Sequence, residues 1–169
     1  MRHICAWCLK ELRNTTAEAG DADGPISHGM CAECLAYFRT NGAPLSEFLN
    51  KLGVPVLAVD GNAGVLAASD QACKMLGKKA CELDGLLAGD AFECAYARRP
   101  GGCGRTIHCK SCAIRITITD TYATARSYTS VPAYPDLCAP EGVRPMRFLI
   151  STQKLGDLVL LRIDDITAP

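Results

Sequence analysis

Residues 54–69 read Val54-Pro55-Val56-Leu57-Ala58-Val59-Asp60-Gly61-Asn62-Ala63-Gly64-Val65-Leu66-Ala67-Ala68-Ser69. Two short apolar runs stand on either side of Asp60-Gly61-Asn62, and Asp, Gly and Asn are residues that favour a tight turn. The stretch therefore predicts a β-hairpin. Ser69 or Asp70 can cap a following helix over 71–76, which Gly77 would end.

Downstream of this hairpin, helical patterns come first and strand patterns last. The predicted elements are, in order, a short helix at 81–87, a strand at 126–131, an extended connection with four prolines at 131–145, and strands at 146–152 and 157–166. Residues 113–125 are ambiguous. Ile114, Ile116 and Ile118 alternate as in a strand, yet the first and third also share one helical face with Tyr122.

Two strands, several short helices and then three strands is the element order of a PAS domain, and residues 45–167 resemble that family. The matching points are Pro55–Asp60 as the first strand, Gly64–Ser69 as the second, a helix ending at Leu76-Gly77 and the final strand at 157–164. The resemblance implies an α+β fold with a five-stranded antiparallel sheet and helices on one face. It also makes Ala113–Ala125 the long helix that packs on the sheet, against its β-branched content.

A cysteine-rich stretch, CAYARRPGGCGRTIHCKSC, precedes that segment. Its glycines between 101 and 104 allow the backbone to wrap closely around a bound group. Thiolates are the metal-binding form of cysteine, and neighbouring cations such as Arg98, Arg99 and Arg115 favour that form. The stretch therefore predicts a metal ion or an iron–sulfur cluster held by four ligands: Cys94, Cys103, Cys109 and Cys112.

Three chemistries remain open for these four thiols. Thiolates near glycine N–H groups suit an iron–sulfur cluster, the same ligands suit zinc, and a reactive thiol pair suits a redox switch that forms a disulfide. His108 and Arg105 are predicted to lie beside the ligands. The stretch resembles a cysteine-rich variant of bacterial PAS sensors at Gly89-Asp90, Cys94, Gly101–Gly104 and Cys109-x2-Cys112.

Another cysteine set opens the chain, as Cys5-x2-Cys8 and Cys31-x2-Cys34. A Cys-x2-Cys turn places both sulfurs on one side of a knuckle, and two knuckles complete a tetrahedron. This spacing therefore predicts a structural zinc site, with His28 beside the ligands. The segment also resembles a four-cysteine element of bacterial signalling proteins, which implies a structural metal knuckle.

These patterns divide the chain into a zinc-binding module at 1–40, a linker helix at 41–52 and a PAS-like sensor domain at 53–169. The apolar residues of the linker occupy one face of a helix. They are Leu45, Phe48, Leu49 and Leu52. That face could pack on its own domain or form the seam of a dimer, and the sequence leaves both open.

The composition limits the function. Lys and Arg number 18, as do Asp and Glu, so the formal net charge is zero and nucleic acid is not an expected partner. Eleven cysteines, no signal peptide and no membrane-length apolar run indicate a cytoplasmic protein, where clustered thiols more often bind metal than form disulfides. The sequence has no phosphate loop, nucleophile elbow or kinase motif, so an enzyme is not expected.

The sequence therefore predicts a bacterial signal-transduction protein, a sensor of redox state, oxygen or metal that reads its signal through Cys94–Cys112. We expect a homodimer. The sequence ends just after the last strand, so either the signal would pass in trans to a kinase or regulator, or the protein is a fragment or relic. Two alternatives stay open: a zinc-stabilised module that binds protein or nucleic acid, and a PAS pocket for a small ligand in which the cysteines are structural.

Overall fold

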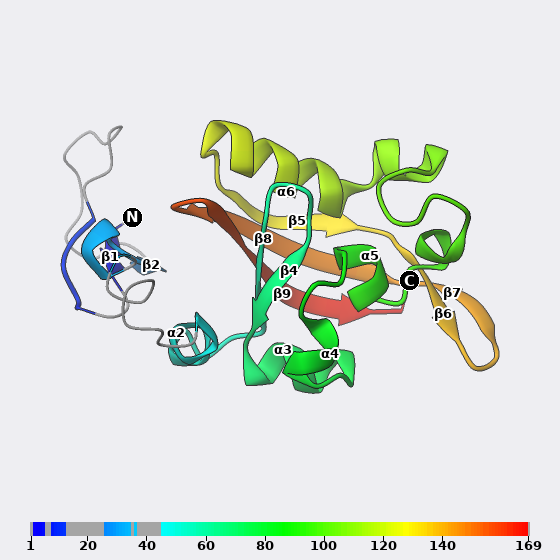
Figure 1. Ribbon diagram of the computed structural model, residues 1–169, viewed down its shortest axis with the longest axis horizontal. Helices are drawn as coiled ribbons and strands as arrows, with labels where there is room; N and C mark the ends of the chain where they lie inside the picture. Colours follow the sequence, from blue (N-terminus) through cyan, green and yellow to red (C-terminus); the bar gives the residue numbers. More distant parts are fainter. Residues whose placement is uncertain (1, 6–7, 13–25, 35, 37–44, 169) are drawn as a thin grey trace.

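The structure is a computed structural model that describes residues 2–5, 8–12, 26–34, 36 and 45–168 (Figure 1). Its centre is a five-stranded antiparallel sheet with the strand order β4-β3-β9-β8-β5. The strands are β3 (Val56–Val59), β4 (Val65–Ala68), β5 (Tyr128–Ala133), β8 (Arg147–Leu155) and β9 (Leu158–Thr167). The predicted α+β class and five-stranded antiparallel sheet are confirmed.

The β3–β4 hairpin is closed by the side chain of Asp60. Its Oδ1 atom accepts hydrogen bonds from the N–H groups of Asn62 and Gly64, each at 2.8 Å. Such local bonds from a side chain to the following backbone are the reason that Asp favours turns. The turn therefore forms where the sequence predicts it.

A series of short helical segments follows β4. They are α3 (Asp70–Leu76), α4 (Ala80–Leu83), α5 (Ala88–Ala91), the 3-10 turns η1 (Ala95–Arg98) and η2 (Ile107–Ser111), and α6 (Ala113–Thr124). The segment at 113–125 is thus helical. Ile114, Thr117, Ile118 and Thr121 are buried on its inner face, so packing against the sheet outweighs their low helix propensity. No helix in the described residues is long and apolar enough to cross a membrane.

The central strands β3 and β9 are apolar on both faces. Their residues alternate between two cores, as the period of a strand requires. The front core, covered by α3 to α6, contains Leu57, Val59, Val159, Leu161 and Ile163, and the rear core contains Val56, Ala58, Leu158 and Leu160. Both faces of the sheet therefore need a cover.

The rear core is covered by α2 (Leu45–Lys51) and by the N-terminal cysteines. Phe48 and Leu49 are fully buried there, and Leu45 and Leu52 pack against them. The predicted apolar face of this helix thus packs within its own chain, and the segment predicted to be a linker covers the sheet. The predicted boundaries at residues 40 and 52 stay predictions.

The proline-rich segment forms a hairpin, so the extended connection predicted for 131–145 is wrong. Strand β6 (Asp136–Ala139) pairs antiparallel with β7 (Gly142–Pro145). Proline is tolerated because no N–H donor is needed where it lies: Pro132 is on the edge strand β5, Pro140 is in the turn and Pro145 ends β7. The hairpin projects from one end of the sheet (Figure 1).

Ser69 joins the β3–β4 hairpin to the helices. Its Oγ accepts hydrogen bonds from the N–H groups of Val56 at 3.0 Å and Ala72 at 3.2 Å, and donates one to the carbonyl of Val54 at 3.1 Å. Ser69→Ala should lower the free energy of unfolding by about 1–3 kcal/mol, because it removes the N-cap of α3 and the acceptor of a buried N–H group. The measurement is urea unfolding, with the exposed Ser127→Ala as control. Equal midpoints in the two variants would contradict this role.

Candidate functional site

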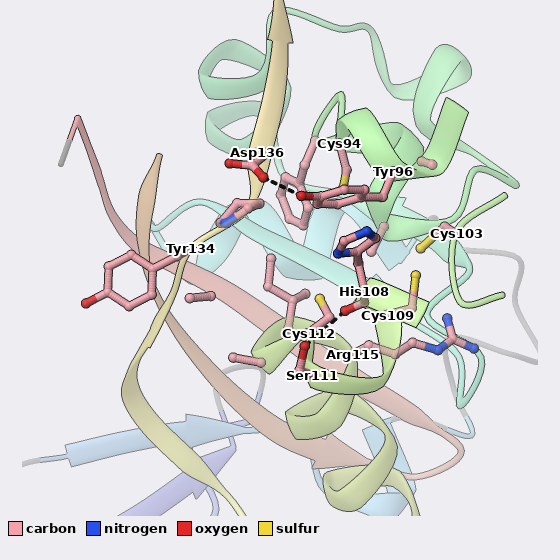
Figure 2. Close-up of a pocket in the computed structure, with 18 of the residues that line it drawn as sticks. Cys94, Tyr96, Cys103, His108, Cys109, Ser111, Cys112, Arg115, Tyr134 and Asp136 are labelled. Atoms are coloured by element: carbon pink, nitrogen blue, oxygen red, sulfur yellow. Dashed lines mark hydrogen bonds between the residues drawn. The ribbon is translucent and has the colours of Figure 1, made fainter. Parts of the chain in front are cut away.

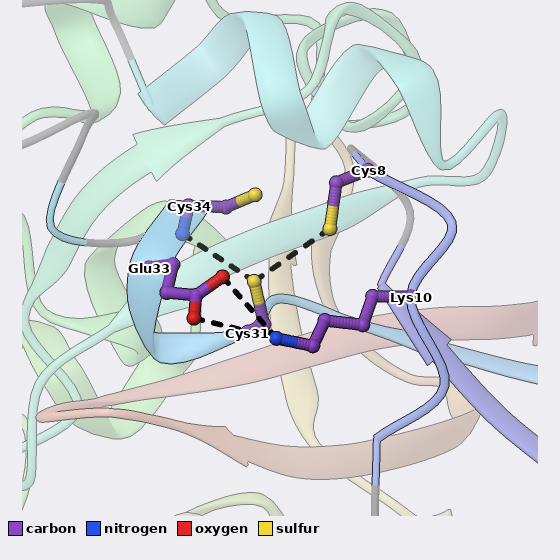
Figure 3. A network of polar contacts seen from close by, with 5 residues as sticks. All are labelled: Cys8, Lys10, Cys31, Glu33 and Cys34. Atoms are coloured by element: carbon purple, nitrogen blue, oxygen red, sulfur yellow. Dashed lines mark hydrogen bonds and ion pairs between the residues drawn. The ribbon is translucent and has the colours of Figure 1, made fainter.

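The N-terminal cysteines form one cluster, of which Figure 3 shows Cys8, Cys31 and Cys34. The sulfurs of Cys5, Cys8, Cys31 and Cys34 all lie within 4.8 Å of one another. Strand β1 (Arg2–Cys5) ends at the first of these cysteines and pairs in parallel with β2 (Ile26–Gly29), which precedes the second Cys-x2-Cys turn. This pairing brings together the four ligands that the sequence predicts.

Backbone hydrogen bonds shape both turns. The N–H of Cys5 donates to the carbonyl of Lys10 at 2.8 Å, which closes the first turn. In the second turn, the N–H of Cys34 lies 3.4 Å from the sulfur of Cys31 and donates to it. Lys10 and Glu33, one from each turn, form an exposed ion pair at 3.3 Å, a contact that adds little stability. The sulfurs are therefore positioned mainly by the backbone.

A single tetrahedral ion fits this cluster. Zinc–sulfur bonds of about 2.3 Å place the thiolates of such a site roughly 3.8 Å apart, and the sulfurs of Cys8 and Cys31 are 3.7 Å apart. Burial and the neighbouring thiols raise the pKa of Cys34, since thiolates this close repel one another. A divalent cation would relieve that repulsion, and four sulfur donors suit zinc or iron.

The cluster also belongs to the rear core of the sheet. Cys5, Cys31 and Cys34 are buried in the same group of side chains as Phe48 and Leu49. The turns that would hold a metal ion are thus part of the cover over the rear face. His28 lies on β2, and its side chain is outside the described part of the chain, as is residue Trp7.

The second cysteine set lines a cavity of about 310 Å³ on the front side of the sheet (Figure 2). The cavity lies between α5, η1, η2, the start of α6 and the connection from β5 to β6. Its wall includes all four ligands predicted for this stretch: Cys94, Cys103, Cys109 and Cys112. The structure therefore brings them to one space.

Hydrogen bonds surround the sulfur of Cys109. It lies 3.1 Å from the N–H of Gly104 and 3.2 Å from the hydroxyl of Thr106. Burial alone would raise the pKa of this thiol, but hydrogen bonds from these two residues and the nearby guanidinium of Arg115 hold it below its usual value. The thiolate of Cys109, which is the form that binds metal, is therefore reached at a lower pH than that of an ordinary cysteine.

Cys94 and Cys103 have more apolar surroundings, and burial raises the pKa of both thiols. Cys103 rests against α5, where Gly89 makes room for it: a Cβ at Gly89 would lie 2.7 Å from the sulfur. Gly104, with a φ of +88°, makes similar room for Arg115, because a Cβ there would lie 2.5 Å from the guanidinium. The two glycines allow the loop to approach α5 and α6 closely.

An aromatic stack forms another part of the cavity wall. The rings of Tyr96 and His108 lie 3.8 Å apart with an interplanar angle of 16°. The hydroxyl of Tyr96 donates a hydrogen bond of 2.6 Å to Asp136 on β6. Figure 2 shows the two rings among the labelled cysteines. The stack connects η1 and η2 with the β6–β7 hairpin.

Some of these wall residues are not predicted from the sequence. His108, which the sequence predicts beside the ligands, lies in the wall next to Cys109. Arg105, which is predicted there too, is exposed and is not a wall residue. Arg115 is the wall residue that brings a positive charge near Cys109. The sequence offers one hint that Tyr96 belongs to the site, because it is an aromatic residue inside the cysteine stretch. It offers none for Asp136, which is 40 residues away from Tyr96.

The two cysteine sets differ in how close together their side chains lie in the structure. Among the residues that the structure describes, only the N-terminal set brings three or more metal-binding side chains within 4.8 Å of one another. The second set lies around a cavity instead. Metal or cluster binding by the second set stays a prediction.

No protein-family model matches the chain, and no curated protein matches it significantly. Solved structures of similar fold include PAS domains and a LOV protein. The PAS domain of the quorum-sensing receptor RpfR from Cronobacter turicensis, in complex with BDSF, is 16% identical, with 67% of this chain and 93% of that chain covered and a TM-score of 0.45. The PAS domain of nitrogen regulation protein NR(II) from Vibrio parahaemolyticus is 13% identical, and the match covers 75% of this chain and 100% of that chain with a TM-score of 0.46. The LOV protein of Rhodobacter sphaeroides is 15% identical, and the match covers 70% of this chain and 63% of that chain with a TM-score of 0.47. The likeness concerns the fold alone.

Because the N-terminal cluster is part of the rear core, an ion bound there would stabilise the whole sheet, and losing it should destabilise the sheet. We expect Cys34→Ser to lower the melting temperature by roughly 6–12 °C, the effect of losing about 3 kcal/mol in a domain of this size. Structural zinc sites contribute more than this. The control, Cys81→Ser, changes an exposed thiol outside both sets. If both variants melt at the same temperature, the cluster and the sheet are not coupled.

Proposed function

We propose that the protein is a sensory signalling domain that reads its signal at the cavity lined by Cys94–Cys112. In this proposal the four thiols there hold a metal centre, and the N-terminal cluster holds a structural zinc ion. The observation that carries the proposal is the convergence of four thiols on one cavity between the helices and the sheet. The hydrogen bonds from Gly104 and Thr106 and the nearby Arg115 support it, since they lower the pKa of Cys109 and so favour its metal-binding form more than in an ordinary cysteine.

The cavity wall is joined to the helix that packs on the sheet. Cys112 is the N-cap of α6, and its carbonyl accepts the N–H of Ile116 at 2.9 Å. Ile114 and Ile118, within the first two turns, are buried in the front core. The helix contacts β5, β8 and β9. A displacement of Cys112 would therefore be transmitted through α6 to the sheet.

The wall is also joined to the β6–β7 hairpin. Cys94 forms an isolated β-bridge with Leu137 on β6. The N–H of Cys138 donates to the carbonyl of Glu93 at 2.8 Å. Strand β7, at the other side of the hairpin, is exposed along its whole length. The hairpin thus offers a route from the thiols to a surface that a partner could contact.

We place this sensor in a reducing cytoplasm, as a homodimer that signals in trans to a kinase or regulator. Eleven cysteines support the compartment, because clustered thiols stay reduced and metal-bound there. The formal net charge of zero makes nucleic acid the weaker partner.

The shape of the cavity favours one second candidate, a binding pocket for a small ligand. A volume of about 310 Å³ is at the lower end of the range for ligand pockets. The Tyr96–His108 stack provides a flat aromatic surface, and Asp136 and Ser111 provide polar groups. In that case the cysteines only support the wall, and replacing them would leave ligand affinity unchanged.

The sensor proposal predicts that the cavity thiols hold η2 and α6 in place. In anaerobically purified protein, Cys112→Ser should raise amide hydrogen exchange in residues 107–118 by about tenfold or more, the effect of losing about 1.4 kcal/mol of local stability. Loss of a cap would not explain this, because the side chain of Cys112 makes no capping bond and Ser is a preferred N-cap.

Cys81→Ser again serves as the matched control, since it replaces a thiol outside the cavity. Two results would contradict the sensor proposal. One is equal exchange in residues 107–118 of both variants. The other is parent protein that binds no metal beyond the N-terminal site.

A further inference from the structure

We propose that the second cysteine set holds an iron–sulfur cluster and not a single zinc ion. The inference rests on the proposed function, in which the same thiols hold a metal centre. Its ligands are Cys94, Cys103, Cys109 and Cys112. The N-terminal cluster provides the comparison within the same chain, because it shows how this protein arranges four cysteines for one ion.

Spacing is the first argument. A single tetrahedral ion requires sulfurs roughly 3.8 Å apart, and the N-terminal set meets this requirement with 3.7 Å between Cys8 and Cys31. No three side chains of the second set, all of which are described, come within 4.8 Å of one another. A cluster distributes its four thiolates over two or more iron atoms, so the four ligands cannot all stand as close together as around one ion, and they surround a body of appreciable volume. A cavity with all four thiols in its wall provides that arrangement.

Hydrogen-bond donors are the second argument. The properties of iron–sulfur clusters depend on hydrogen bonds to their sulfurs. At Cys109 the N–H of Gly104 and the hydroxyl of Thr106 lie within 3.2 Å of the sulfur. The N-terminal site has N–H···S bonds too, as between Cys34 and Cys31, so a backbone donor alone does not distinguish the two sites. The side-chain hydroxyl of Thr106 is an additional donor, which substitution can remove.

The charge and polarity of the wall are the third argument. Four thiolates leave a cluster with net negative charge, and Arg115 brings a positive charge beside Cys109. The carboxylate of Asp136 already accepts a hydrogen bond from Tyr96. Much of the remaining wall is apolar, with Phe92, Ala97 and Ile114 among its residues. Such a wall limits the access of water, which is one of the factors that set cluster potentials.

Thr106 is then a positioning residue for the cluster ligand Cys109. A hydrogen bond to a thiolate favours the state with more negative charge, which for a cluster is the reduced state. Removing the hydroxyl should therefore make the reduction potential more negative. Thr106→Ser keeps the hydroxyl and should restore the parent behaviour.

The test compares anaerobically purified parent protein with four variants by visible absorption and by content of iron, acid-labile sulfide and zinc. Parent and Cys34→Ser should be coloured and contain iron and sulfide, whereas Cys112→Ser should lose both. Thr106→Val should keep the colour, but its ratio of oxidised to reduced cluster at a fixed potential should rise about tenfold, which equals 59 mV for one electron. Thr106→Ser should match the parent. If Cys34→Ser does not fold, the comparison of colour, iron and sulfide between the parent and Cys112→Ser decides the test.

The outcomes separate this inference from the proposed function. A colourless parent protein with zinc at both sites would overturn the cluster and leave a metal-based sensor standing. A parent protein with metal at the N-terminal site only would overturn both. A coloured Thr106→Val variant with the potential of the parent would overturn the assignment of Cys109 as a cluster ligand.

Discussion

The central strands β3 and β9 carry apolar side chains on both faces, and the arrangement of the described chain follows from the need to cover them. Leu57 and Leu161 face the front core, and Val56 and Leu160 face the rear core. Buried apolar surface contributes about 25 cal/mol per Å², so a face left in water would forfeit a large part of the stability. Helices α3 to α6 cover the front, while α2 and the N-terminal cysteine turns cover the rear. The two cysteine sets therefore belong to opposite sides of one sheet.

This arrangement supports the different roles that we propose for the two sets. Three cysteines of the N-terminal set are buried in the rear core, where an ion would hold the cover in place. All four of the second set are only half-buried, in the wall of a cavity. A structural metal ion must remain bound, whereas a sensing centre must be accessible to the signal that it detects. Burial and spacing thus support the same division: a tight site that stabilises the sheet and a wider site that can respond.

The sequence predicts the parts of this structure that depend on local chemistry. Asp60 closes its turn and Ser69 caps its helix through bonds to residues a few positions away, so residue type suffices. The N-terminal cysteines are also predictable, because ligand type and spacing together define the site. For 113–125 the residues alone leave helix and strand open, and burial against the sheet makes the segment helical.

Other features depend on contacts that no local pattern reveals. The sequence does not predict the β6–β7 hairpin, because the prolines in this segment argue against strands unless they lie at an edge, in a turn or at a strand end, as they do here. The contact of Tyr96 with Asp136 joins residues far apart in sequence. The stretch predicts the four thiols of the second site, but the cavity that they share exists only once η1, η2 and α6 are packed. The sequence thus predicts which thiols come together here, but not the distances between their sulfurs.

We propose that one sheet carries a tight site for a single ion on its rear side and a wider cluster site on its front side. X-ray absorption at the zinc and iron edges, on one anaerobic sample, tests both sites together. We expect zinc with sulfur neighbours at about 2.3 Å, and iron with both sulfur and a second iron as near neighbours. Zinc at both sites without iron, or iron with no iron neighbour, would contradict it.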